Sequence, residues 1–432
     1  MQMKGVPSYE IAKSILPEKV SISPEQFRGI KPKLVVREGD KVETGSPLFF
    51  DKLKPKVKWA SPSSGVVTNI QYGDRRVIEN IEITVEDKKL DLSKSFSSSQ
   101  LNTADRDTIL KSILDACIFP LIRQRPFNKV ANPDEIPRDI FISAYNTAPL
   151  SVSLSKIIQD NKDEFQTGLT ALSKLTNGSV YFTSKESMEF DNAINVTISG
   201  PHPAGNVGIQ VHHIKPINPG EVIWTVNAQH VITIGKLFQN GYYDPGCIIS
   251  IGGSGSSKPQ TVKAPIGSSI DALLNDQLLN GSYRIVSGDV LTGKKVNSDG
   301  YLGFYDSSVA IINDDVKRPF LGMLAVGSSS TKYSLTNTFL STRANEFDFT
   351  TSQNGELRAI VPLNAWEKML PMNILPNPLY RAILAQDIEE MEQLGIWECD
   401  DEDFALCSFA CPSKIDVGSV IRDGLDLLEN DG

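Results

Sequence analysis

Between residues 105 and 251 the sequence alternates helical and strand-like patterns, and this alternation restricts the possible folds more than any other feature. Residues 105–118, DRDTILKSILDACI, place apolar side chains at helical spacing after acidic residues, and Pro120 ends the pattern. Strand-like runs are expected at 140–144, 180–183, 194–199, 207–214 and 247–251, and helical patterns at 150–158, 165–175 and 226–238. This order predicts a mostly parallel sheet covered by helices.

The segments on either side of this series predict further folding units. Residues 34–50 and 59–67 alternate apolar and polar positions between glycine and proline turns, which is typical of a compact all-β unit. Residues 262–292 predict a strand, a short helix capped by Ser268 or Ser269, and more strands.

The last hundred residues turn helical. Asn377 and Pro378 begin an apolar stripe at helical spacing, and Gly395 ends it.

The glycine-rich run at 252–255 has no helix after it, so we interpret it as an interdomain linker. A chain of 432 residues is too long for one core, and we expect a multidomain protein of α/β and α+β type. The expected domains are 1–98, all β; 99–257, α/β; 258–328, α+β; and 329–432, helical.

Composition excludes several functions. The net charge of −9 argues against a partner that is a nucleic acid or an anionic membrane surface. No apolar stretch reaches the roughly 20 residues that a membrane-spanning helix needs, and the first residues lack a secretory signal. Five scattered cysteines indicate reduced thiols. We therefore expect a cytoplasmic protein that meets a membrane only through a partner.

The motifs of nucleotide binding and hydrolysis are missing from the sequence. It has no G-x-G-x-x-G between strand and helix, no G-x-x-x-x-G-K-[ST], no G-x-S-x-G and no H-E-x-x-H. All four histidines lie between His202 and His230, but His212 and His213, as neighbours in an expected strand, would face opposite sides of the sheet. The sequence therefore predicts a Rossmann-like domain without its nucleotide motif, and neither catalytic residues nor a metal site.

Residues 199–213, SGPHPAGNVGIQVHH, form a loop that glycine and proline together force into one path. Two interpretations are open. The segment is either a rigid turn inside the α/β domain, or a functional loop that presents His202 to a pocket.

This loop carries a family resemblance. The run GPHPAGNVGIQVHH, followed by Ile214-Lys215-Pro216-Ile217, resembles a signature of the NqrA family. Members of this family are subunits of the bacterial Na+-translocating NADH:quinone oxidoreductase. The α/β domain also resembles the NADH- and flavin-binding subunit of complex I and the C subunit of the Rnf complex. The small α+β unit resembles their β-grasp domain, called SLBB.

Two further stretches resemble known domains with altered cofactor positions. The pattern E-G-D-x-V-x-x-G-x-x-L with A-S-P-x-x-G-V-V resembles the barrel-sandwich hybrid of biotinyl and lipoyl domains, and Asp51-Lys52 resembles the Asp-Lys pair that carries lipoate in lipoyl domains. The run LKPKVKW after it adds competing lysines, so a structural barrel or a docking loop is favoured over lipoylation. Its lysines either face an acidic partner or lipid headgroups, or form a solvated edge. Cys407 and Cys411 form a C-x3-C-P run, but only Cys399 is nearby, which indicates a degenerate ferredoxin-like domain without its cluster.

The flavin loop of these relatives corresponds here to residues 117–127, CIFPLIRQRPF, which contains no glycine. The resemblance therefore implies a flavoprotein fold without flavin and without an NADH site. Arg123 and Arg125, beside Phe127 and Lys129, either meet a partner or an anionic ligand, or are simply solvated on a surface loop.

A quinone is the ligand that the resemblance leaves possible. The segment 366–376, WEKMLPMNILP, is broken by proline and offers methionine and leucine side chains to a partner, to a quinone tail or to the core. Six residues are the candidate contacts with a quinone or with another subunit: Phe127, Lys129, His202, Met372, Leu375 and Tyr380.

The resemblance implies a peripheral subunit on the cytoplasmic face of the bacterial inner membrane. It would belong to a six-subunit pump that reduces ubiquinone to ubiquinol and exports sodium, with the flavins and iron centres in its membrane and peripheral partner subunits. The isolated chain would then be non-catalytic, with no redox centre of its own. The alternative is an independent cytosolic flavin- or NADH-dependent oxidoreductase.

Overall fold

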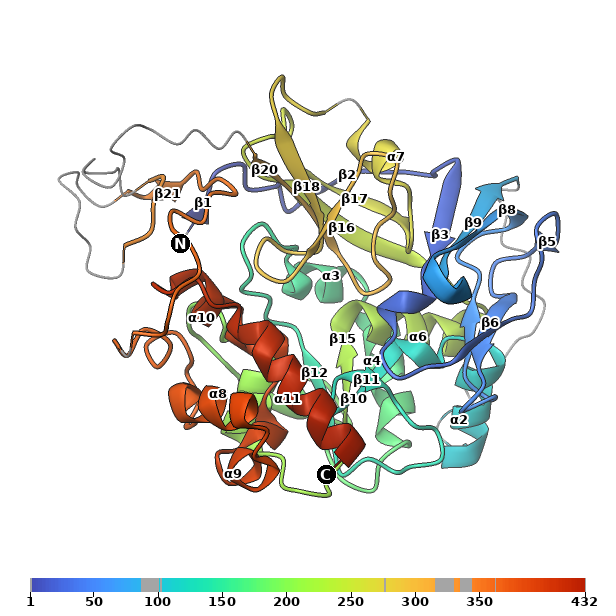
Figure 1. Ribbon diagram of the computed structural model, residues 1–432. Helices are drawn as coiled ribbons and strands as arrows, with labels where there is room; N and C mark the ends of the chain where they lie inside the picture. Colours follow the sequence, from blue (N-terminus) through green and yellow to red (C-terminus); the bar gives the residue numbers. More distant parts are fainter. Residues whose placement is uncertain are drawn as a thin grey trace.

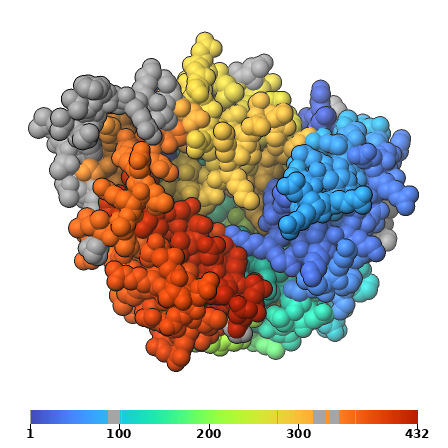
Figure 2. Space-filling model, in the orientation of Figure 1, coloured from blue at the N-terminus to red at the C-terminus, as the bar shows by residue number. Residues whose placement is uncertain are grey.

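The computed structural model describes residues 2–86, 101, 103–275, 277–314, 330–334, 344–361 and 363–431. The N-terminal unit and the C-terminal helices flank opposite sides of the face shown in Figure 2, with a β-rich unit above them. The expected domain boundaries at 98/99 and 328/329 fall outside the described residues.

The α/β domain is built on a six-stranded sheet in the order β11-β10-β15-β12-β13-β14. Its strands are β10 (Ile122–Arg125), β11 (Lys129–Val130), β12 (Ile140–Ser143), β13 (Val180–Ser184), β14 (Ile194–Thr197) and β15 (Ile223–Asn227). Strands β12 to β15 pair in parallel, as expected, while β10 runs antiparallel to β15 and β11.

Helices cover this sheet (Figure 1). They are α2 (Arg106–Asp115), α3 (Leu154–Asp160), α4 (Lys162–Ser173), α5 (Val207–Ile214) and α6 (Ala228–Asn240). Helices α4 and α6 touch through glycines, because a Cβ on Gly235 would lie 1.7 Å from the Glu164 carbonyl oxygen. Gly241 closes α6 in the left-handed conformation, as its position predicts.

Two sequence expectations in this domain are wrong. Residues 207–214 form helix α5 and not a strand. Strand β15, rich in β-branched and aromatic residues, was not expected, and α6 begins only after it, at Ala228. In both places a short apolar run fits either periodicity, so the neighbouring elements decide the outcome.

The N-terminal unit is a sandwich of two sheets, β3-β9-β8-β5 and β4-β6-β7. The strands are β3 (Lys19–Ile22), β4 (Pro32–Leu34), β5 (Lys41–Val42), β6 (Pro47–Asp51), β7 (Lys58–Ala60), β8 (Gly65–Tyr72) and β9 (Ile78–Val85). The rings of Phe49 and Trp59 stack in its core, 4.6 Å apart. Asp51 is buried and accepts backbone N–H bonds from Lys31 and Leu53, so it fixes a turn.

A second six-stranded sheet follows the order β19-β18-β20-β16-β17-β2. It contains β2 (Ile11–Ser14), β16 (Gly246–Gly252), β17 (Gln260–Pro265), β18 (Tyr283–Ser287), β19 (Lys294–Val296) and β20 (Ser308–Asn313), with helix α7 (Ile270–Leu274) beside it. Ser269 occupies the N-cap position of α7, but its side chain makes no capping bond. At the far edge of the molecule, β1 (Gln2–Met3) pairs with β21 (Glu346–Phe347).

The glycine-rich run at 252–255 is not a linker. Strands β16 and β17 pair antiparallel on either side of it, so it is a turn within one sheet. Gly253 has φ +110°, and a Cβ there would lie 2.2 Å from the Ile311 carbonyl oxygen. The turn needs glycine because the backbone of β20 passes directly against it.

The C-terminal unit consists of helices packed beside the α/β domain (Figure 1). They are α8 (Pro376–Ala385), α9 (Ile388–Gln393), α10 (Ala405–Ala410) and α11 (Val417–Asp431), with 3-10 turns η4 (Ile396–Glu398) and η5 (Asp401–Phe404). The single helix expected after Pro378 is wrong, because Gln386 is left-handed and Asp387 caps a new helix by accepting from the Glu390 N–H. Across the described residues, no helix combines the length and apolar character needed to span a bilayer.

Candidate functional site

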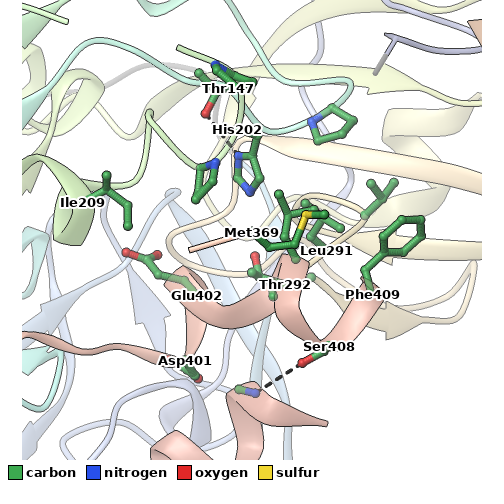
Figure 3. Close-up of a pocket in the computed structure, with 18 of the residues that line it drawn as sticks. Thr147, His202, Ile209, Leu291, Thr292, Met369, Asp401, Glu402, Ser408 and Phe409 are labelled. Atoms are coloured by element: carbon green, nitrogen blue, oxygen red, sulfur yellow. Dashed lines mark hydrogen bonds between the residues drawn. The ribbon is translucent and has the colours of Figure 1, made fainter. Parts of the chain in front are cut away.

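A cavity of about 1930 Å³ opens where the α/β domain, the second six-stranded sheet and the C-terminal helices meet (Figure 3). Its wall is formed by residues 196–204, from the end of β14 into the glycine-proline loop, by 145–147 and 149 after β12, 290–293 after β18, 349–354, and parts of 401–422. The segments come from distant parts of the sequence, so only the tertiary fold creates this space.

The glycine-proline loop is fastened to the segment after β12. Tyr145 Oη donates to the Gly200 carbonyl at 2.6 Å, and the Gly205 N–H donates to Thr147 Oγ1 at 2.9 Å. A Cβ on Gly205 would lie 2.4 Å from the Tyr145 carbonyl oxygen, so only glycine allows this approach. Both the rigid-turn and the pocket interpretations of the loop are therefore correct in part: it is rigid, and it presents His202 to the cavity.

Hydrogen bonds define the state of His202. Its Nδ1 lies 3.1 Å from Thr147 Oγ1, which already accepts the Gly205 N–H. We therefore assign the Thr147 hydroxyl hydrogen to Nδ1, which leaves the ring hydrogen on Nε2. Burial lowers the pKa of His202 and keeps the ring neutral. Nε2 is buried and has no hydrogen-bond partner in the described part of the chain.

The rest of the wall is mixed in character. Figure 3 shows apolar side chains of Ile209, Leu291, Met369 and Phe409 around the space that His202 faces. Polar groups enter from Thr292, Ser408, Asp401 and Glu402. Apolar walls with a few convergent polar groups are typical of small-molecule sites.

Arg125 is the centre of a buried ionic cluster beside this cavity. Its guanidinium contacts Asp400 at 3.1 Å, Glu402 at 2.5 Å and Asp403 at 3.3 Å. The arginine side chain is 2% exposed. The interpretation of Arg125 as a surface-loop residue is therefore wrong: it lies on strand β10 and joins the α/β domain to the C-terminal unit.

Two more arginines complete this cluster. Arg422 of α11 pairs with Asp400 and with Asp401 at 3.0 Å, and Arg28 of the N-terminal unit pairs with Asp401 at 2.7 Å. Three separate parts of the chain thus meet at residues 400–403. This cluster was not predicted from the sequence, although its four consecutive acidic residues, DDED, are visible there.

The six residues proposed from the sequence are dispersed. His202 lines the cavity, while Leu375 is 59% exposed at the start of α8. Met372 is buried in the C-terminal core, which favours the core-packing alternative for it. The other three make the following contacts: Phe127 with the Trp397 ring, Lys129 with Glu429, and Tyr380 with the Trp366 ring.

Helix α5 changes the interpretation of the paired histidines. His212 Nδ1 lies 2.8 Å from Glu398 Oε2, and its Nε2 accepts from the Asn373 N–H at 3.0 Å. His213 Nε2 donates to the Pro371 carbonyl at 2.8 Å. They share one side of the molecule, against the strand-based expectation, and fasten the segment 371–373 to α5. No cluster of three potential metal ligands occurs among the residues described.

The cysteines of the C-x3-C-P run belong to the C-terminal core. Cys399, Cys407 and Cys411 are free and buried. Burial raises the pKa of Cys407 to about 12, which keeps its thiol protonated.

Family models cover most of the chain and identify its class. The models for the NqrA N-terminal barrel-sandwich hybrid domain, the NqrA second alpha/beta domain and the NQRA C-terminal domain match residues 1–86, 104–243 and 248–298. These are the domains of a multidomain α/β protein of the NqrA type.

Full-length relatives give the same result. The chain is 35% identical to the A subunit of the Na(+)-translocating NADH-quinone reductase of Marinomonas sp. and 36% identical to that of Saccharophagus degradans, over 100% of this chain and 98% of each relative. The chain therefore belongs to the NqrA family, the A subunits of Na+-translocating NADH-quinone reductases. The family prediction is confirmed, while the β-grasp and ferredoxin-like assignments and the exact domain boundaries stay predictions.

Proposed function

We propose that this chain is a peripheral subunit of a Na+-translocating NADH-quinone reductase and binds the quinone in the cavity beside His202. In this proposal the complex lies in the bacterial inner membrane, with this chain on its cytoplasmic face, and reduces ubiquinone to ubiquinol as it exports sodium. Membrane and peripheral partner subunits carry the flavins and iron centres. Family membership favours this function over that of an independent cytosolic oxidoreductase.

The orientation of His202 carries the proposal. A neutral imidazole whose buried Nε2–H has no partner among the described residues offers one hydrogen bond to a carbonyl oxygen, and a quinone headgroup has two such oxygens. Leu291, Met369 and Phe409 supply an apolar surface for the tail. The volume of about 1930 Å³ exceeds the roughly 300–1,000 Å³ of common ligand pockets, so a headgroup and part of a long tail both have room.

The packing of residues 117–127 supports a chain without its own flavin. Phe119 and Leu121 are buried, and β10 is paired on both edges by β11 and β15. A phosphate group held by backbone N–H groups needs an open loop, which this segment does not provide.

The test is a titration of the purified chain with a short-chain ubiquinone, followed by tryptophan fluorescence, after its visible spectrum has been recorded. We expect a colourless protein with saturable quenching, a dissociation constant raised several-fold in His202→Ala, and no change in Leu375→Ala. If Leu375→Ala and not His202→Ala weakens binding, the quinone binds at the surface before α8. Absence of saturable quenching would refute quinone binding by this chain, and a coloured protein would refute the absence of a redox centre.

A further inference from the structure

Residues 400–403 bring more negative charge into the ionic cluster than the arginines neutralise. Its members are the carboxylates of Asp400, Asp401, Glu402 and Asp403 and the guanidinium groups of Arg28, Arg125 and Arg422. Asp426 also lies 4.0 Å from Arg422, but it is 57% exposed and is stabilised by water. The four carboxylates of residues 400–403 against three guanidinium groups leave one excess negative charge. A buried charge without a partner costs much free energy, so binding of one proton is the favourable way to remove it.

Asp403 is the carboxyl best placed to hold that proton. Asp400 lies near three guanidinium groups, those of Arg125, Arg422 and Arg28, and accepts from Asn128. Among the described residues Asp403 is paired with one guanidinium group, that of Arg125 at 3.3 Å from its Oδ2, and the Asn206 amide is its other polar neighbour. Its side chain is fully buried, and Oδ1 has no hydrogen-bond partner among the described residues. Burial raises the pKa of both Asp400 and Asp403, against the opposing effect of Arg125.

Glu402 connects this cluster with the cavity. It shares Arg125 with Asp403, and its side chain is 29% exposed and lines the cavity. Figure 3 shows Glu402 on the C-terminal side of the space and His202 on the loop side. The charged and titratable groups around the cluster and His202 include Arg28, Arg125, Asp289, Glu398, Cys399, Asp400, Asp401, Arg422 and Asp426, besides Glu402 and Asp403 themselves.

We propose that the cluster stores one proton and that Glu402 transfers it to the bound quinone. This proposal rests on the quinone site proposed above. NADH oxidation in the complex supplies two electrons to the quinone. His202 Nε2–H holds one quinone oxygen. The stored proton moves to Glu402, whose O–H bond then breaks as an O–H bond forms on the other quinone oxygen. The first oxygen takes its proton from water, and the cluster takes one up from water, so two electrons and two protons enter each quinol.

The stored proton is tested without any quinone. Infrared spectra of the full chain at neutral pH are expected to contain the C=O stretch of a protonated carboxyl group, shifted in heavy water and lost in Asp403→Asn. Asp139→Asn is the matched control, because Asp139 is equally buried but contacts both Arg138 and Lys215 at 2.7 Å. The band should persist in this variant. A wild-type spectrum without the band, or a band that survives in Asp403→Asn, would overturn the proton store.

The transfer is tested in the assembled complex with Glu402→Gln. We expect quinone binding by fluorescence to stay within twofold of wild type, while quinone reductase turnover falls about 100-fold, as expected for loss of a general acid. Glu221→Gln is the control, because Glu221 is 31% exposed and paired with Arg138 away from the cavity. Unchanged turnover in Glu402→Gln would refute the transfer. Failure of quinone binding in the wild type would instead refute the proposed function, and the infrared result would still stand.

Discussion

Gly208 and Asp403 lie in direct contact, although they are almost two hundred residues apart. A Cβ on Gly208 would be 2.0 Å from Asp403 Oδ2 and 2.7 Å from Arg125 Nη1. Because Gly208 of helix α5 has no side chain, the ion pair between Arg125 of β10 and Asp403 of η5 can lie against the helix backbone. This contact joins the family's loop sequence to the C-terminal unit.

Substitution Gly208→Ala is therefore expected to destabilise the protein. Alanine normally stabilises a helix by about 1 kcal/mol relative to glycine, but here its methyl group meets two buried charged groups. We expect a net loss of about 1–3 kcal/mol in the free energy of unfolding, measured with urea. The loss should shrink in an Asp403→Ala background. A Gly208→Ala protein as stable as wild type would contradict the contact.

Arg125→Met should be among the most damaging single substitutions. It leaves three carboxylates without their shared partner, and breaking a buried ion pair in this way costs about 3–5 kcal/mol. Urea unfolding monitored at the C-terminal tryptophans measures the loss. Lys111→Met serves as control, since its ion pair with Asp115 is exposed, and it should leave the unfolding curve unchanged.

Thr147→Val should weaken quinone binding without unfolding the protein. The valine keeps the side-chain shape but removes the hydroxyl that contacts His202 Nδ1 and accepts the Gly205 N–H. Loss of one such bond is worth about 1 kcal/mol, or roughly a fivefold higher dissociation constant in the fluorescence titration. Thr292→Val also lies in the cavity wall, but its hydroxyl bonds to Asp289, and it should bind normally. Equal effects of both variants would argue against a specific role of His202.

His230 should make the protein less stable in acid. Burial, together with the charge of Arg123, lowers the pKa of His230 from 6.5 to about 4. The unfolded chain therefore binds a proton below pH 6.5 that the folded chain does not, so stability falls as the pH drops from 6.5 towards 4. The loss amounts to roughly 3 kcal/mol at about 1.4 kcal/mol per pKa unit. Urea unfolding of His230→Gln, compared with wild type across this range, should lack that part of the slope; parallel pH profiles would contradict it.

Much of the fold follows from local sequence patterns. Helix α2 is preceded by Asp105, whose side chain accepts the Thr108 N–H, and the acidic start of this segment had predicted a helix. Strands β12 and β13 are bounded by turn residues and appear where expected. The division of the expected helix after Pro378 into α8 and α9 could also have been predicted, because Asp387 followed by Glu390 is a helix-start pattern. The continuous apolar stripe favoured a single helix instead.

Other features of the structure could not be predicted from neighbouring residues in the sequence. The run 207–214 alternates apolar and polar residues and fits a strand, yet it is helical beneath β12, where Val211 is buried beside Phe141. The burial of Arg125 could not be predicted from the residues around it, because its three carboxylate partners are nearly three hundred residues away in the sequence. Of the six candidate contacts, only His202 lines the cavity, since a cavity wall is assembled from segments that do not adjoin in sequence.

The family, the order of the β, α/β and helical units, and the rigid path of the glycine-proline loop all follow from the amino-acid sequence. These depend on residues within a few positions of one another, where backbone preferences and apolar periodicity act. The packing of the whole chain brings Gly208, Arg125 and Asp403 together, turns His202 towards a large cavity and places Glu402 across from it. Such contacts depend on how whole elements pack, and the burial of charge that gives this site its chemistry arises only from that packing.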